Sequence, residues 1–206
     1  MVETRLEGVE MEAPAARRVA FIAMMGALSN ALFVLSATLF NWGQVTLDLS
    51  HMGTLIAAFY GGPLAGLAVG AIAGLGSGLY FGSVSGLIPL FLPGLVVGKS
   101  LTGLGVGLLS KAFNVLGRER KAVAAVAITL LGYVPECLFT IAFFLVLIPL
   151  FAPHAAAWLT PLWASIVSKA WIEMGIMGFY MAALVGNQGF TQLVGRLWPM
   201  PAAPSR

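Results

Sequence analysis

A run of 47 residues without any charged side chain or histidine, residues 52–98, most constrains how this chain can fold. One membrane-spanning helix needs only about 20 apolar residues, so the run is long enough for more than one span. The composition agrees, because 59% of the 206 residues are hydrophobic and only 9% are charged. A soluble domain of this size carries roughly 25% charged residues. The sequence therefore predicts an all-α, polytopic membrane protein.

Breaks in the apolar pattern divide the chain into six predicted transmembrane helices. Glycine and proline mark several of these breaks, most clearly at Gly61-Gly62-Pro63. The predicted helices cover residues 19–40, 47 or 52 to 60, 64–81, 87 to 109 or 116, 122–151 and 161–185. We expect Pro135 to kink the fifth of them. The six-helix domain is thus predicted at 19–188, between a polar tail at 1–18 and a second tail at 189–206.

The distribution of positive charge predicts how these helices are oriented. With six spans, all segments that carry arginine or lysine outside the helices fall on the side of both termini. These residues are Arg17, Arg18, Lys111, Arg118, Arg120, Lys121, Arg196 and Arg206. The positive-inside rule then places both termini in the cytoplasm of a multi-pass protein of the plasma membrane. Because the basic residues are few and scattered, we expect the lipid bilayer and no nucleic acid as a partner.

Small residues recur every four positions in two of the predicted helices. The glycine stripe consists of Gly66, Gly70, Gly74, Gly78 and Gly82, and the alanine stripe of Ala23, Ala27 and Ala31. Such stripes let helix backbones approach closely inside a membrane. We expect the glycine stripe to pack within this chain. For the alanine stripe, packing within the chain and contact with another protein remain alternatives.

The sequence contains no convincing catalytic or nucleotide-binding motif. The segment PGLVVGKS (93–100) resembles a phosphate-binding loop, but only three residues separate Gly94 from Gly98 where four are needed. Gly76-Ser77-Gly78 lacks the flanking pattern of a serine nucleophile. No cysteine or aspartate stands at metal-ligand spacing beside His51 or His154. We therefore expect no enzymatic activity, no metal site and no cofactor.

Four charged residues fall inside predicted helices, namely Lys99, Glu136, Lys169 and Glu173. At 1.5 Å per residue they lie about 13 to 22 Å from the outer helix ends, in the central part of a core about 30 Å thick. Each costs roughly 2.5–3.5 kcal/mol if left alone, so we expect these side chains to face the bundle interior and pair. A structural salt-bridge network and a polar site reached from outside are both compatible with this pattern.

The segment TLDLSHMGTLIAAFYGGPLAGLAVGAIAGL (46–75) resembles the S components of energy-coupling factor (ECF) vitamin importers. The shared features are a polar loop after the first helix, a serine leading into the second, and an apolar turn at Gly62-Pro63 into the third. The stretch TLDLS (46–50) looks most like the riboflavin-specific members. The sixth helix departs from their pattern, with Pro161-Leu162-Trp163 ahead of the lysine, so another vitamin is an alternative.

The resemblance implies a high-affinity substrate-binding subunit of an ABC importer. It implies a transmembrane coupling subunit, contacted by the alanine stripe, and two ATPase subunits as partners. The implied vitamin site lies between the fourth, fifth and sixth helices under the loop 41–51. Its expected residues are Asn41, Trp42, Gln44, Asp48, Lys99, Glu136, Lys169, Trp171 and Glu173. An autonomous secondary transporter that uses the intramembrane glutamates and lysines is the alternative, and it would move substrate alone in liposomes.

Overall fold

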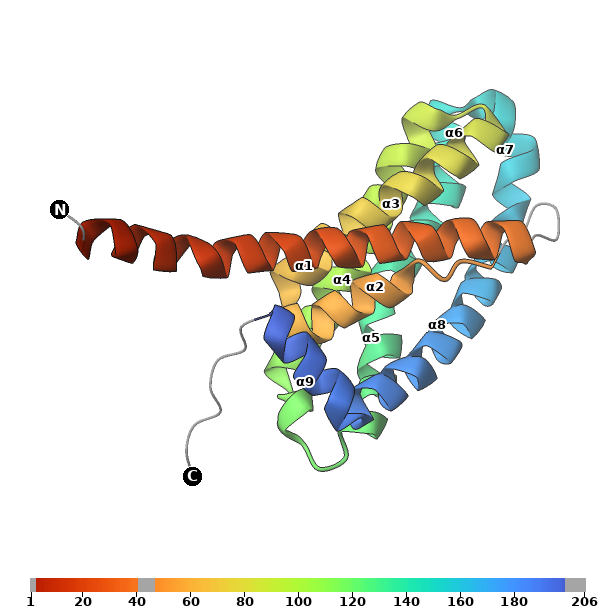
Figure 1. Ribbon diagram of the computed structural model, residues 1–206. Coiled ribbons are helices and arrows are strands. Elements are labelled where there is room, and N and C mark those ends of the chain that lie inside the picture. Colours follow the sequence, from red (N-terminus) through yellow and green to blue (C-terminus); the bar gives the residue numbers. More distant parts are fainter. Residues whose placement is uncertain (1–2, 41–46, 199–206) are drawn as a thin grey trace.

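The computed structural model of the chain describes residues 3–40 and 47–198, with side chains from residue 15 onward. These residues form helices and no β-strand, which confirms the predicted all-α class (Figure 1). The elements in order are α1 (Glu3–Leu39), α2 (His51–Ile56), the π-helical η1 (Ala57–Gly61), α3 (Pro63–Ser85), α4 (Ile88–Ala112), the 3-10 turn η2 (Val115–Gly117), α5 (Lys121–Ala142), the π-helical η3 (Phe143–Leu147), α6 (Ile148–Phe151), α7 (Pro153–Leu159), the 3-10 turn η4 (Thr160–Leu162), α8 (Trp163–Gly186) and α9 (Gln188–Leu197).

Within the described residues, four helical stretches are long and apolar enough to cross a membrane. They are Ala15–Leu39, Pro63–Ser85, Ile88–Ala112 and Lys121–Phe151. Helix α8 has 24 residues, a sufficient length, but it carries Lys169 and Glu173. The second predicted helix is different, because α2 and η1 together hold 11 residues. They extend for about 16 Å, roughly half of a hydrocarbon core.

Two predicted tails and one predicted connection contain helix. Helix α1 begins at Glu3 and not at residue 19, and α9 occupies much of the predicted tail 189–206. The expected connection 152–160 folds as α7 and the start of η4. The apolar residues Phe190, Val194 and Leu197 recur at helical spacing in α9, and Val194 is buried. This short amphipathic pattern was not predicted from the sequence, because the proline-rich residues that follow it suggested a tail without regular structure.

Proline and glycine shape the helix ends more than the helix interiors. Helix α5 continues through Pro135, and the first departure from α-helical geometry is η3, which begins at Phe143. The turn into α3 requires glycine, because Gly62 has φ 81° and ψ −169°. Gly86 closes α3 with φ 70°, a left-handed conformation that lets the N–H of Leu87 donate to the carbonyl of Gly82 at 2.8 Å.

The glycine stripe is buried against α4, as the sequence predicts. A Cβ atom at Gly66 would lie 2.3 Å from the carbonyl oxygen of Gly103, and one at Gly70 would lie 2.4 Å from that of Lys99. At Gly78 the nearest atom would be the Cα of Leu92, at 2.8 Å. The two backbones therefore touch directly, and α3 and α4 form the most extensive helix pair of the bundle.

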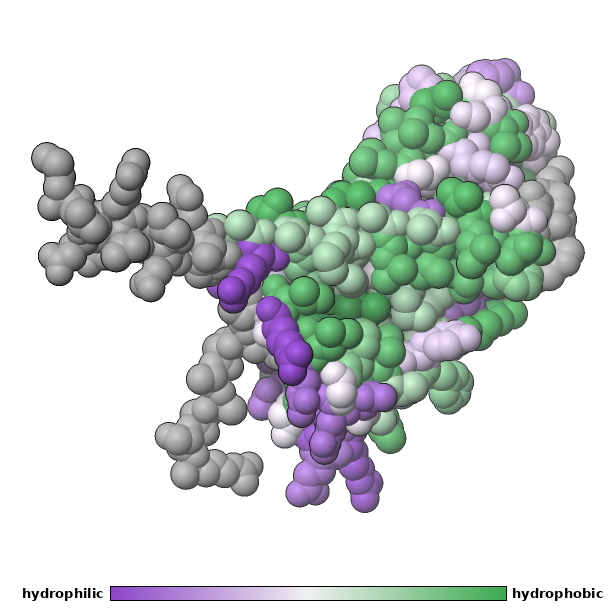
Figure 2. Space-filling view, viewed as in Figure 1, coloured by the Kyte–Doolittle hydropathy of each residue, from purple (hydrophilic) through white to green (hydrophobic). Residues whose placement is uncertain are grey.

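The alanine stripe, in contrast, remains on the surface. Ala23, Ala27 and Ala31 are exposed, whereas Phe21 and Phe33 on the other side of α1 are buried. Figure 2 shows the described part of α1 as a pale green, weakly apolar band facing the viewer. No described segment of the chain covers this band, so packing within the chain does not explain the stripe.

The connections gather at two ends of the bundle. Figure 1 shows the turn between α3 and α4 beside α6 and α7, which we call the α6–α7 end. The connection between α4 and α5 lies with α9 at the opposite end, which is purple in Figure 2. We call this the basic end, because the guanidinium of Arg18 lies 5.5 Å from the Trp198 ring that follows α9, and Arg118 and Arg120 belong to the α4–α5 connection.

Candidate functional site

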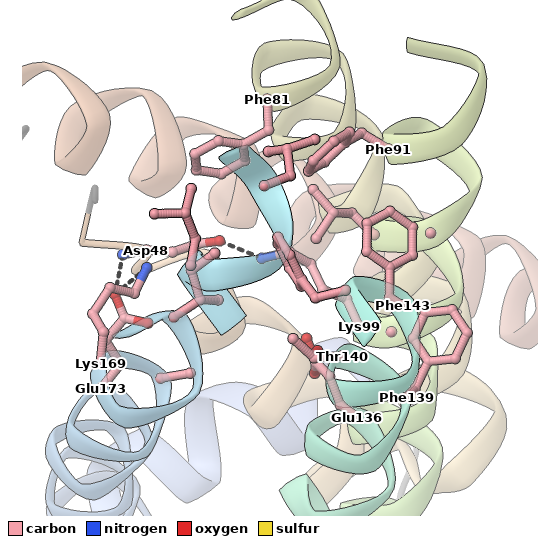
Figure 3. Close-up of a pocket in the computed structure, with 18 of the residues that line it drawn as sticks. Asp48, Phe81, Phe91, Lys99, Glu136, Phe139, Thr140, Phe143, Lys169 and Glu173 are labelled. Carbon is pink, nitrogen blue, oxygen red and sulfur yellow. Dashed lines mark hydrogen bonds and ion pairs between the residues drawn. The ribbon is translucent and has the colours of Figure 1, made fainter. Parts of the chain in front are cut away.

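A cavity of about 360 Å³ opens among α3, α4, α5, α8 and the segment from η3 to η4 (Figure 3). This volume lies in the range of small-molecule binding sites. The cavity belongs to the α6–α7 end, because its lining includes Ser85 from the end of α3, Trp158 from α7 and Leu162 from η4. Its walls divide into an aromatic side and a charged side.

The aromatic side is built by five phenylalanines, namely Phe81, Phe91, Phe139, Phe143 and Phe144. Phe91 and Phe143 meet edge to face with ring centroids 5.3 Å apart. Helix α4 leaves room for this ring at Gly94, where a Cβ would lie 2.4 Å from Phe143. The π-helical turn η3 is fixed by Thr160, whose hydroxyl donates to the carbonyl of Phe144 at 3.2 Å. The result is a firm apolar wall suited to a flat ligand.

The charged side begins with Lys99, whose side chain is 1% exposed. Its ammonium pairs with the carboxylate of Asp48 at 2.6 Å and donates a hydrogen bond to the hydroxyl of Ser50. The short contact and the burial of both side chains are those of an ion pair between an ammonium and a carboxylate. Asp48 is therefore a carboxylate that neutralises Lys99.

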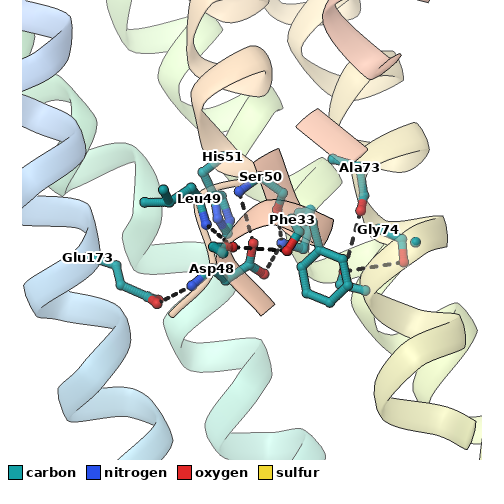
Figure 4. Close-up of polar contacts among 12 residues, drawn as sticks. Phe33, Asp48, Leu49, Ser50, His51, Ala73, Gly74 and Glu173 are labelled. Carbon is teal, nitrogen blue, oxygen red and sulfur yellow. Dashed lines mark hydrogen bonds and ion pairs between the residues drawn. The ribbon is translucent and has the colours of Figure 1, made fainter. Parts of the chain in front are cut away.

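The non-helical segment 47–50 carries Asp48 into the interior of the bundle (Figure 4). Lys99 follows Ile88 by 11 positions, so Asp48 meets α4 about 16 Å below its start. Each of the four N–H groups of this segment has an acceptor: the carbonyl of Phe40, the carboxylate of Glu173, the hydroxyl of Ser36 and the carboxylate of Asp48 itself. Non-helical backbone is tolerated at membrane depth only when it is satisfied in this way.

Two further acidic residues complete the charged side. The carboxylate of Glu136 lies 3.0 Å from the Nε2 of His51, and the same oxygen accepts a hydrogen bond from the hydroxyl of Thr102. On α8, the ammonium of Lys169 lies 3.2 Å from the carboxylate of Glu173, one helical turn away. The charged side thus consists of three pairs contributed by five separate segments of the chain.

The structure brings five of the residues expected from the sequence to this cavity: Asp48, Lys99, Glu136, Lys169 and Glu173. The expected pairing of the four intramembrane charges is confirmed for Lys169 with Glu173. Trp171 lies outside the lining, because its ring packs edge to face on Tyr133 with centroids 5.3 Å apart. Asn41, Trp42 and Gln44 lie outside the described residues.

Asp48, the partner of Lys99, was expected as a site residue but not as the partner of this lysine, and the partner of Glu136 was not expected at all. His51 was considered only as a metal ligand, although it is buried and pairs with Glu136. Tyr133 and Thr140 were also missed, and both line the cavity. A signal existed for these two, because they lie three positions before and four positions after Glu136, on the same face of a helix.

Comparison with known proteins agrees with this architecture. The family of ECF transporter substrate-specific components matches residues 17–185, which include every described residue that lines the cavity. Neither a curated protein nor a solved structure matches the chain. Members of this family are transporter subunits and not enzymes, and they interact with ECF transmembrane and ATPase components and with a substrate. The chain belongs to the ECF transporter substrate-specific component family.

Proposed function

We propose that this protein is the high-affinity, membrane-embedded binding subunit of an ECF-type ABC importer for a water-soluble vitamin. The observation that carries the proposal is the cavity of about 360 Å³, which joins an aromatic wall to a compact charged side. Riboflavin is the first candidate, since the stretch 46–50 is similar to riboflavin-type members, and another vitamin is the alternative. Asp48, Lys99, Glu136, Lys169 and Glu173 surround the vitamin in this proposal, under a lid that includes Asn41, Trp42 and Gln44.

The proposed topology has six segments in the plasma membrane and both termini in the cytoplasm. The basic end supports this orientation, because arginine and lysine gather on the cytoplasmic side of membrane proteins. Helix α8 adds a fifth full crossing to the four apolar ones in this proposal, and the segment 47–61 crosses partly as non-helical chain. In this orientation the cavity opens toward the outside, where a vitamin arrives.

The exposed alanine stripe of α1 is the proposed contact with the transmembrane coupling subunit. Alanine lets a partner helix approach closely, and Ala23, Ala27 and Ala31 offer such a surface without a partner in the described chain. Two ATPase subunits supply the energy in this proposal. The chain itself has no phosphate-binding loop, since residues 93–100 lie inside α4.

Equilibrium binding to the purified full chain, measured by tryptophan fluorescence across a vitamin panel, tests the proposal. Trp158 lines the cavity and makes quenching a suitable signal. We expect one vitamin to bind with submicromolar affinity, and uptake into liposomes only when the coupling and ATPase subunits are present with ATP. Concentrative uptake by the chain alone under a pH gradient would instead identify a secondary transporter.

A further inference from the structure

Each carboxylate on the charged side of the cavity already has a partner within the chain. Among the described lining residues, each of the three carboxylates has a basic nitrogen within 3.2 Å: Lys99 for Asp48, His51 for Glu136 and Lys169 for Glu173. A ligand with a carboxylate or phosphate would have to separate one of these pairs or be buried without a counter-charge. Both are unfavourable in a buried site, because an unpaired charge loses its hydration without compensation.

Uncharged polar groups of the same cavity do lack partners. Among the described residues, nothing forms a hydrogen bond with the Tyr133 hydroxyl or with the Thr140 hydroxyl. The Nδ1 atom of His51 is likewise buried without a described partner, although Nε2 of the same ring is bound to Glu136. The two hydroxyls belong to residues that line the cavity, so a ligand in the cavity can supply the hydrogen-bond partners that the chain does not.

These open groups lie where a flat ring can reach them. Tyr133 and Thr140 flank Glu136 on one face of α5, three and four positions away, so their side chains follow one another along the cavity wall. Figure 3 shows Thr140 beside Glu136, below the rings of Phe91 and Phe143. Tyr133 is 2% exposed and is held by the ring of Trp171. A ring stacked on the aromatic side therefore presents its edge to hydroxyl groups on α5.

We propose that the ligand is an uncharged aromatic heterocycle, and that its ring N–H and carbonyl groups bind the hydroxyls of Tyr133 and Thr140. The pairs Asp48–Lys99, His51–Glu136 and Lys169–Glu173 then hold the helices and the segment 47–50 in place, and they do not bind a charged group of the ligand. This inference rests on the proposed function, and it narrows the substrate to a class with polar edges, an apolar face and no net charge.

The first experiment measures the affinity of the purified full chain for ligands that differ in charge. The probes are riboflavin, riboflavin 5′-phosphate, nicotinamide, nicotinate, biotin, pantothenate and thiamine. We expect the tightest ligand to be an uncharged aromatic one, and its anionic counterpart to bind at least 100-fold more weakly. An acid or a cation as the tightest ligand would overturn the inference and leave the proposed function standing. If none of the probes binds, the proposed function and the inference both fail.

The second experiment tests the residues that read the ligand. Tyr133→Phe and Thr140→Val each remove one hydroxyl and keep the side-chain shape, so each is expected to weaken the tightest probe about tenfold at an unchanged melting temperature. Thr140→Ser, which keeps the hydroxyl, restores the affinity. Tyr180→Phe is the matched control, because Tyr180 lies 54% exposed on α8, and it leaves binding unchanged. Affinity within twofold of the parent protein in both Tyr133→Phe and Thr140→Val would overturn the assignment.

Discussion

Two stripes of small residues follow the same four-residue period in this protein but have opposite surroundings. The glycine stripe of α3 touches the backbone of α4, whereas the alanine stripe of α1 is exposed. The difference lies in the connections. Helices α3 and α4 are joined by a single tight turn at Gly86, so α4 is the partner within reach. Helix α1 is followed by a segment that enters the bundle, and its outer face is not covered by any described segment of the chain.

The two stripes show that a row of small residues predicts a close contact between helix backbones, but does not predict whether the second helix belongs to the same chain or to another protein. Glycine permits a contact at which no Cβ fits, as at Gly66, where the added atom would lie 2.3 Å from a carbonyl oxygen. Alanine carries a Cβ and so permits a close contact, but one at a larger backbone separation than glycine permits. We therefore expect changes in the glycine stripe to affect folding and changes in the alanine stripe to affect assembly.

The largest effect is expected for Gly74→Leu. A Cβ at this position would already lie 2.5 Å from the Cα of Val96, so a leucine forces α3 and α4 apart and should cost more than about 3 kcal/mol. We expect little folded protein in size-exclusion chromatography and a much lower melting temperature. Leu75→Ala is the control, because Leu75 is 46% exposed. A Gly74→Leu protein that melts like its parent would mean that the glycine stripe is not a folding contact.

The second effect should appear only in the assembled transporter. Ala27→Trp adds bulk to an exposed position, so folding and ligand affinity are expected to stay within twofold while uptake falls by more than tenfold. Uptake by liposomes that contain the coupling and ATPase subunits is the measurement. Leu138→Trp, at a 62% exposed position of α5, should leave uptake unchanged. Normal uptake by the Ala27→Trp transporter would remove the alanine stripe from the proposed interface.

A matched pair within the glycine stripe separates folding from binding. Gly66→Ala and Gly70→Ala each place a Cβ against a carbonyl oxygen, and each should destabilise the protein by about 1–3 kcal/mol. The carbonyl oxygen that the new Cβ at Gly70 would meet belongs to Lys99, whose side chain pairs with Asp48. The one that a Cβ at Gly66 would meet belongs to Gly103. We expect Gly70→Ala to weaken ligand binding several-fold and Gly66→Ala to leave it unchanged when both are measured below their melting temperatures. Equal affinities would show that the cavity tolerates a shift of α4.

The smallest effect is expected for Ala27→Gly. Glycine keeps the surface open to a partner helix but lowers helix stability by about 1 kcal/mol. Uptake should therefore stay within twofold of the parent protein, and the melting temperature should fall slightly. A large loss of uptake would indicate that the methyl group itself makes the contact, so that the stripe acts through shape and not only through small size.

The regular parts of the fold follow from the sequence because they repeat with a helical period. The apolar runs predicted the long helices, and the spacing of Gly66, Gly70 and Gly74 predicted their close packing. Helix α7 and helix α9 were missed, since each is too short to show a long apolar run. Helix α7 packs mainly on its neighbours α6 and η4, whereas α9 packs on α8 and on α1, which lies far away in the chain.

The site was predictable in its charges but not in its pairs. A lysine inside a predicted membrane helix indicates that an acidic partner lies nearby. Asp48 and Lys99 are nevertheless separated by 51 positions, and only the path of the segment 47–50 brings them together. That path depends on acceptors from α1 and α8, which no local pattern reveals. Tyr133 and Thr140 were not predicted for another reason. A hydroxyl group indicates a ligand contact only when the structure shows that it has no hydrogen-bond partner within the described chain.

The shortness of α2 and η1 also bears on how the protein is made. Eleven helical residues offer too little apolar surface to be recognised and released into the bilayer as an independent segment. They must therefore enter together with α3, to which Gly62 joins them as a hairpin. Asp48 then remains without its ammonium until α4 has been synthesised. Biogenesis of this protein thus passes through a stage at which Asp48, buried in the finished bundle, has not yet met the basic side chain that it pairs with.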